Sequence, residues 1–177
     1  MIKGILSWGK PRIFVKKLDA SGTSTYEYRE LPTPVDDSTT LETTEGDKTE
    51  AKIEGGEVEA VRYDRSTYKL SMQIRMKAGS EMPFANEDGL VTDNYEVVVA
   101  PENPAAYGIR MLEANVAVKT SYSTNDGVMV DVSFDALKSG NSKQCEIGTV
   151  AVTGDGGLTP YAITFTSIAD AQDVATA

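Results

Sequence analysis

The clearest pattern in the chain is a strict alternation of apolar and polar residues over residues 68–77. The even positions are all apolar, namely Tyr68, Leu70, Met72, Ile74 and Met76, and the odd positions are all polar. Successive side chains of a β-strand point to opposite faces, so a period of two predicts a strand with one buried face. A helix would scatter the same apolar residues around its circumference.

A second pattern predicts a β-hairpin from residues 112–124 and 128–137. Apolar residues occupy even positions on both sides of the turn, at Val116 and Val118 and then from Val128 to Phe134. A loop of three residues, 125–127, places both sets on one face and pairs Tyr122 with Val130. That loop needs a left-handed residue at its third position, where the sequence has Gly127.

A third hairpin is predicted over residues 48–64, closed by Gly55 and Gly56. Paired glycines suit a two-residue turn because both residues then adopt positive φ. With that turn Ile53 faces Val58 and Ala51 faces Ala60, so apolar residues meet on one face.

Short apolar or β-branched runs bounded by turn residues predict the remaining strands. Residues 78–94 are expected to be irregular, with a turn at residues 87–89 and room for one short helix. The C-terminal residues are expected to hold one frayed helical turn capped by Ser167. The fold class is therefore mainly β: a β-sandwich or β-barrel of about eight to ten short antiparallel strands with at most one or two short helices. The further strands are expected at residues 12–18, 25–30, 95–100, 147–153 and 161–166.

Length and charge indicate one domain with an acidic segment. A chain of 177 residues suits a single domain. We expect an N-terminal arm at residues 1–11, a β domain at 12–166 with a long acidic loop at 36–48, and a C-terminal tail at 167–177. Residues 36–59 hold nine acidic residues and two lysines, which is −7 of the chain's net charge of −10. An acidic, threonine-rich surface suits a protein partner or the repulsion of phosphate, and it disfavours binding to nucleic acid.

Residues able to carry chemistry are few. The chain has no histidine, the commonest general base and transition-metal ligand, and its one cysteine, Cys145, has no histidine to activate it. The acidic residues are expected to form a solvated surface, and neither 36–38 nor 154–156 has the spacing of a calcium loop. We therefore expect no enzyme, no cofactor and no metal. No apolar run approaches the ~18 residues of a membrane helix, and the N-terminus is a poor signal peptide.

The sequence also resembles a known family. The similarity covers about residues 1–150, and it is most specific at residues 45–48 (EGDK) and 54–57 (EGGE). The segments that carry the resemblance are residues 8–18, 31–57, 68–75, 97–108 and 134–141. In these segments the sequence is similar to tail-tube (major tail) proteins of bacteriophages and prophages from gut Bacteroidetes.

The resemblance implies a subunit of a phage tail tube. Six copies would form a ring, with two hairpins from each copy around a common lumen, and rings would stack into a conduit through which DNA passes without specific binding. Stacking would use the long loop, with Leu41, Glu42, Glu45, Asp47 and Lys48 as candidate residues. It would also use the N-terminal arm, with Ile5, Leu6 and Trp8. The lumen hairpins would come from residues 48–64 or 67–77 and from 112–137. The other partners would be further tail proteins, with no membrane. The subunit would lie in the host cytoplasm during assembly and then in the virion tail.

Two alternatives remain open. The first is the tube of a contractile injection system, which has the same architecture. The second is a non-enzymatic β-sandwich binding module of the adhesin or carbohydrate-binding type. That class would need exposed aromatic platforms and an export signal, and neither is evident in the sequence.

Overall fold

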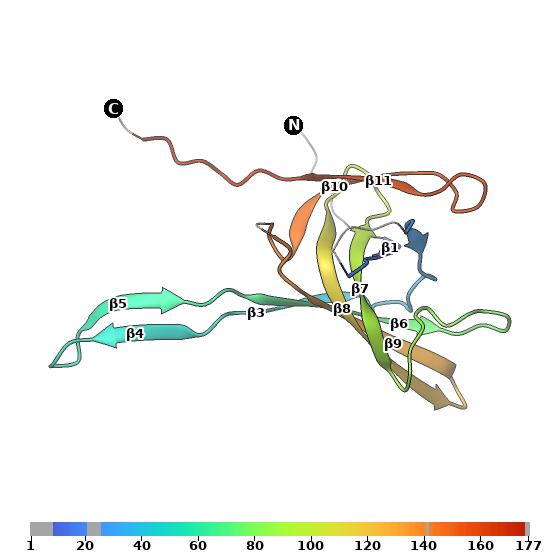
Figure 1. Ribbon diagram of the computed structural model, residues 1–177, viewed down its shortest axis with the longest axis horizontal. Coiled ribbons are helices and arrows are strands. Elements are labelled where there is room, and N and C mark those ends of the chain that lie inside the picture. The colour runs from blue at the N-terminus through green and yellow to red at the C-terminus, as the bar shows by residue number, and fades with distance from the viewer. Residues whose placement is uncertain (1–8, 21–25, 141, 176–177) are drawn as a thin grey trace. The chain divides into compact units, whose positions relative to one another are not determined.

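The fold is built from β-strands. The computed structural model of the chain describes residues 9–20, 26–140 and 142–175, and these residues form eleven strands and no helix (Figure 1). The predicted mainly β, antiparallel class is confirmed, with one strand more than expected because residues 40–44 of the expected loop form strand β3. The strands are β1 Arg12–Lys17, β2 Arg29–Glu30, β3 Thr40–Thr44, β4 Lys48–Lys52, β5 Val58–Tyr63, β6 Thr67–Arg75, β7 Leu90–Ala100, β8 Gly108–Ser123, β9 Gly127–Ala136, β10 Glu146–Thr153 and β11 Ala162–Ser167.

Two predictions concern the chain ends: a helical turn after Ser167 and an N-terminal arm. The helical turn expected after Ser167 is wrong for residues 168–175, which have no regular structure. Short side chains such as Ala169, Ala171 and Ala175 give that segment no apolar face to pack, and nucleating an isolated turn is unfavourable. Ile5, Leu6 and Trp8 of the expected N-terminal arm lie outside the described residues.

The expected β domain divides into two compact units. The first unit comprises Met1–Thr33, Thr92–Ala114 and Leu137–Ala177, and the second comprises Pro34–Val91 and Asn115–Ala136. Two long strands, β7 and β8, each contribute residues to both units. Each unit has its own buried residues, as the following paragraphs describe.

The core of the first unit lies between two sets of strands. Strands β2, β1 and β7 and the first half of β8 are adjacent in that order, and β10 pairs with the start of β8 and with β11. Phe14 on β1 and Val98 on β7 are fully buried, and an edge-to-face contact of 5.1 Å joins the rings of Phe14 and Tyr161. The residues packed around them are Ala100, Val150, Tyr28, Val152, Ile163 and Phe165.

One carboxylate is buried beside this core. Glu96 is 7% exposed; its Oε1 accepts a hydrogen bond of 2.6 Å from the Tyr28 hydroxyl, and its Oε2 lies 3.4 Å from Lys16 Nζ. Burial and then this hydrogen bond raise the pKa of Tyr28, so the phenol stays protonated as the donor. A buried charge needs such partners because desolvation alone would be costly.

Removing that donor is expected to destabilise the first unit. In Tyr28→Phe the Glu96 carboxylate loses its short hydrogen bond while the ring stays, so the free energy of unfolding should fall by about 1–3 kcal/mol. Urea unfolding of the two proteins measures the difference. Tyr63→Phe is a matched control, since Tyr63 is 68% exposed. Equal losses in both variants would contradict the role given to Glu96.

A second ionic cluster gives the first unit a dependence on pH. Arg12 donates two hydrogen bonds to the Glu30 carboxylate, at 3.0 and 3.1 Å, and the Tyr161 hydroxyl donates a third at 3.0 Å. The hydrogen bond from Arg12, more than any other interaction, holds the pKa of Glu30 below its ordinary value.

We therefore expect the first unit to lose stability in acid. A carboxyl whose folded-state pKa is depressed stabilises the fold above its unfolded pKa, and this contribution disappears as pH falls through the lower, folded value. Glu30→Gln should flatten the stability profile between about pH 5 and about pH 2, measured by urea midpoints. Profiles of wild type and variant that stay parallel over that range would rule the effect out.

The second unit is a sheet of strands β3, β6 and β9 and the second half of β8. The predicted alternation in β6 is confirmed, because Leu70, Met72 and Ile74 are each 1% exposed or less. Opposite them on β9 lie Phe134, Val132 and Val130, which are also buried. The ring of Phe84, from the irregular segment 76–89, contacts Phe134 edge to face at 5.7 Å and covers this apolar face.

Turns around this sheet follow the predicted chemistry. Gly127 has φ +72°, so the left-handed conformation predicted at this residue is confirmed, although Gly127 is the first residue of β9 and the loop comprises residues 124–126. The turn at residues 87–89 is also present: Glu87 pairs with Leu90, and both intervening residues, Asp88 and Gly89, have positive φ. The predicted pairing of Tyr122 with Val130 stays a prediction.

Candidate assembly surfaces

The second unit carries a long two-stranded ribbon, which we call the arm (residues 45–66). Strands β4 and β5 pair with each other in a sheet of their own (Figure 1). The arm continues the β3–β6 pair, because the Asp64 amide donates to the Asp47 carbonyl at 2.9 Å. Gly46 lies at this joint, where an added Cβ would stand 2.1 Å from the Asp64 carbonyl oxygen. A residue without a side chain is therefore required there.

The register of the arm differs from the prediction at its tip. Ala51 pairs with Ala60 as predicted, but Val58 is opposite Lys52 and not Ile53. A bulge between Ala51 and Lys52 shifts the pairing by one residue. The turn residues Gly55 and Gly56 have φ of +99° and +88°, so the glycines do close the hairpin.

Every residue of β4 and β5 is exposed. One face of the ribbon pairs Lys48 with Tyr63, Glu50 with Val61 and Lys52 with Val58, and Glu50 contacts both lysines. Its apolar side chains are 44–68% exposed. A two-stranded ribbon without a packed face is marginally stable in water. Exposed apolar side chains on such a ribbon make the arm a candidate surface for contact with a partner.

The outer edge of β3 offers unpaired backbone groups. On β6 the amide and carbonyl of Gln73 bond Ser38 and Val35, on the β3 side. The N–H and C=O of one strand residue point to the same side of the strand, and this side alternates from one residue to the next. Ser71 and Lys69, two and four residues before Gln73, therefore also bond towards β3. Their opposite residues Thr40 and Glu42 therefore bond inward. Leu41 and Thr43 must then point their backbone groups outward, where no strand of the described chain lies.

A matching edge is found at the other side of the sheet. Strand β7 begins at Leu90, and the Val118 amide donates to the carbonyl of the preceding Gly89. Strand β8 continues for five residues past Val118, to Ser123. By the same alternation, Thr120 and Tyr122 point their backbone groups to the side where β7 has ended. The Tyr122 side chain is 73% exposed.

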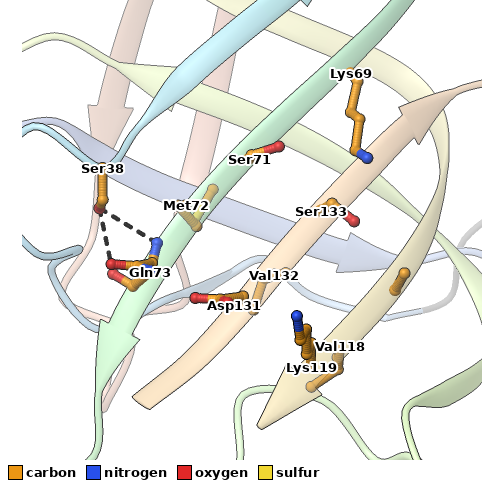
Figure 2. A pocket seen from close by; sticks show the side chains of 11 residues that line it. Ser38, Lys69, Ser71, Met72, Gln73, Val118, Lys119, Asp131, Val132 and Ser133 are labelled. Carbon is orange, nitrogen blue, oxygen red and sulfur yellow. Dashed lines mark hydrogen bonds between the residues drawn. The ribbon is translucent and has the colours of Figure 1, made fainter. Parts of the chain in front are cut away.

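The polar face of this sheet is concave. An open depression of about 440 Å³ is lined by β6, β8, β9 and Ser38 (Figure 2). Gln73 lies opposite Asp131, and Ser71 lies opposite Ser133. Asp131 Oδ1 is buried without a hydrogen-bond partner, the one such side-chain atom in the described part of the chain.

Charges on this polar face balance. The cations are Lys69, Arg75 and Lys119 and the anions are Glu42, Asp131 and Asp135. The acidic excess of residues 36–59 instead falls mostly on the arm. The two lysines Lys69 and Lys119 make no ion pair within the residues that the structure describes, whereas Arg75 lies 3.4 Å from Asp126.

The residues predicted for stacking separate into three groups. Leu41 is opposite Leu70 and half buried, so it belongs to the apolar face of the sheet. Glu42 is opposite Lys69 on the polar face. Glu45 and Asp47 lie at the joint of the arm, and Lys48 begins β4. The expected loop 36–48 is thus a strand over most of its second half.

Burial, more than the neighbouring Glu146, raises the pKa of the Cys145 thiol to about 11, which keeps it protonated and unreactive. Over the described residues, no group of three or more His, Cys, Asp or Glu side chains is placed to hold a metal ion. The described chain also has no helix long and apolar enough to cross a membrane.

A scan against models of protein families finds none that fits the chain, and a search of curated proteins finds no relative.

Proposed function

We propose that the chain is a structural virion protein, the ring-forming subunit of a phage tail tube that stacks into a DNA conduit. The observation that carries the proposal is the second unit: a four-stranded antiparallel sheet with an open edge on each side and an exposed arm beyond it. Open edges invite pairing with another chain, and closing them in a ring removes the liability.

The directions of the strands suit a closed ring. Strands β3, β6, β9 and β8 alternate in direction, so β3 and β8 run oppositely. When β3 of one copy pairs with the end of β8 of the next, the junction is again antiparallel and the alternation continues around the ring. This contact is heterologous, because it joins two different surfaces of the subunit. Heterologous contacts form a closed ring when the rotation between neighbouring copies allows it, and the tail-tube resemblance implies six copies.

The register of this junction follows from the exposed backbone groups. Outward-facing Leu41 and Thr43 can bond only with outward-facing Tyr122 and Thr120. The longest overlap pairs Thr43 with Thr120 and Leu41 with Tyr122. Both pairs then place their side chains on the apolar face, and Thr40 lies opposite Ser123 on the polar face.

The arm serves as the stacking element in this proposal. Its exposed apolar side chains and the marginal stability of an isolated ribbon favour a role in contacting the next ring. The balanced polar face then lines the lumen. A face with as many anions as cations has no net attraction for phosphate, which suits passage of DNA without specific binding.

Cysteine cross-linking tests the ring junction directly. The variant Thr40→Cys/Ser123→Cys, made with Cys145→Ser, places two thiols opposite each other only across copies. Directly opposite residues have Cβ atoms about 4.5–5.5 Å apart, within reach of a disulfide or a short bifunctional reagent. Oxidised assemblies should give a ladder of covalent oligomers that ends at the closed ring.

Two controls make the result decisive. Each single-cysteine variant should give no ladder, and negative-stain microscopy over a concentration series should show rings or tubes. Rings without cross-linking would place the junction elsewhere in the chain. A strict monomer at every concentration, with no ring after seeding with preformed assemblies, would overturn the proposal.

The tube of a contractile injection system remains an alternative with the same subunit contacts, and the genes beside this one would separate the two. A sheath gene would favour the injection system or a contractile tail. In the phage reading the other partners are further tail proteins, and the subunit lies in the host cytoplasm before it joins the virion tail.

One feature favours the binding-module alternative. A shallow depression in the first unit is lined by Tyr28, Tyr161 and Asp155, and tyrosine with a carboxylate is a common pair in carbohydrate sites. The Tyr161 hydroxyl already donates to Glu30 and its ring contacts Phe14, so the ring is held by the protein. Saturable binding in a glycan array, lost in Tyr161→Ala, would favour this alternative.

A further inference from the structure

We propose that Lys119 of one copy forms an ion pair with Glu42 of the next copy, and that this pair limits the registers that the ring junction can adopt. The inference rests on the proposed ring and names the residues that select its alignment. Both side chains lie on the polar face of the second unit, at its two open edges.

Position places the two residues together. Glu42 lies in the middle of β3 with its side chain on the polar face, because its opposite residue Lys69 lies there. Lys119 is the first residue of β8 past its last bond to the β7 side, and it lines the same polar depression (Figure 2). With Thr43 opposite Thr120 across the junction, Lys119 and Glu42 are diagonal neighbours. Diagonal residues on one face are about 7–8 Å apart at the backbone, which long side chains span.

Charge supports the same pairing. Both side chains are exposed, and neither makes an ion pair within the residues that the structure describes. On its own copy Glu42 faces Lys69, and Lys119 lies in the depression with Asp131 and Ser133. A contact across the junction would give each of them an opposite charge on the side that is open in the isolated chain.

The pair distinguishes alternative registers. Sliding β3 by two residues along the partner keeps every side chain on its own face and keeps the backbone bonding pattern. In one direction that slide moves Glu42 away from Lys119 and places it opposite the neutral Ser123. In the other direction it places Glu42 directly opposite Lys119 but shortens the overlap of the two strands. The backbone alone therefore allows several alignments, and opposite charges favour those that keep the two side chains in contact.

Charge reversal and its rescue test the inference. Lys119→Glu and Glu42→Lys should each raise the concentration needed for ring formation by about tenfold, because like charges then meet at every junction of the ring. The double variant restores opposite charges and should return this concentration to within about threefold of the wild type. Light scattering measures assembly at two salt concentrations, and the single-variant defects should shrink at high salt.

Matched variants separate the outcomes. Lys138→Glu and Glu81→Lys make the same changes of net charge at exposed positions away from both edges, and should leave assembly unchanged. Urea midpoints should stay at the wild-type value in the two matched variants, and they also measure the stability that Glu42→Lys loses against Lys69 of its own copy, a loss that the double variant does not restore. If rings form and the single reversals have no effect, or the double variant is not rescued, the ion pair is refuted while the ring stands. If the wild type forms no ring, the proposed function fails instead.

Discussion

Deleting residues 48–63 and joining Asp47 to Asp64 through an Asn-Gly turn is expected to abolish tube formation while leaving the ring and the fold intact. The deletion removes β4 and β5, whose residues are all exposed, and no buried side chain. The Asp64 amide already bonds the Asp47 carbonyl, so a two-residue turn closes the shortened ribbon without changing the sheet.

The size of this effect follows from the apolar side chains on the arm. Ile53, Val58, Val61 and Tyr63 are each roughly half exposed or more, and covering them at a ring-to-ring contact would contribute about 1 kcal/mol each. Losing all four raises the concentration needed for stacking by more than about a hundredfold. Sedimentation and electron microscopy should then show rings that do not stack.

A milder variant serves as the control for this deletion. Glu54→Gln/Glu57→Gln keeps the ribbon and changes only charge near its tip, and it should still stack. A deletion that forms tubes as readily as the wild type would remove the arm from the stacking contact. Loss of cooperative unfolding would instead show that the arm supports the sheet. The deletion spares residues 40–44 because they form β3, which pairs with β6 along its whole length.

Elements with a strong local pattern could be predicted from the sequence. Strands β6, β8 and β9 carry their apolar residues at alternate positions, and Gly127 marks the one turn that keeps those residues on a common face. In these strands the same residues specify both the local conformation and the buried face. Local and tertiary requirements therefore agree, and pattern alone identifies the strand.

Strand β3 could not be predicted, because its stability comes from its neighbour. Residues 40–44 contain a single large apolar residue, Leu41, and this is typical of an edge strand as much as of a loop. The bulge beside Lys52 likewise has no signal in the sequence, so the register expected from the glycine pair was off by one residue. The sequence identified the hairpin, but its exact alignment depends on backbone geometry.

The candidate site was the least predictable feature of all. An open edge is defined by what does not lie beside a strand, and no residue type encodes it. The buried Glu96 shows the same limit, since an acidic residue within an apolar run has no signature until Tyr28 and Lys16 are seen beside it. Gly46 was one of several glycines, and only the Asp64 carbonyl shows why a side chain is excluded there.

A proline at Thr43 is expected to prevent ring formation without unfolding the chain. The Thr43 backbone points outward from β3, so proline removes a donor that the isolated sheet does not use. The ladder between β3 and β6 keeps its bonds at Thr40, Glu42 and Thr44. At the proposed junction, however, the Thr43 N–H donates a hydrogen bond to the Thr120 carbonyl of the next copy. Thr43→Pro removes this hydrogen bond. The pyrrolidine side chain of proline also clashes with the strand of the next copy.

The control for this variant is Thr43→Ala, which keeps the amide and removes the side chain. Assembly should be lost in Thr43→Pro and retained in Thr43→Ala, with urea midpoints close to the wild-type value in both. The loss should be large, because a missing hydrogen bond of about 1 kcal/mol recurs at every junction of a closed ring. Rings formed by Thr43→Pro at wild-type concentrations would show that the open edge of β3 is not the surface through which copies meet.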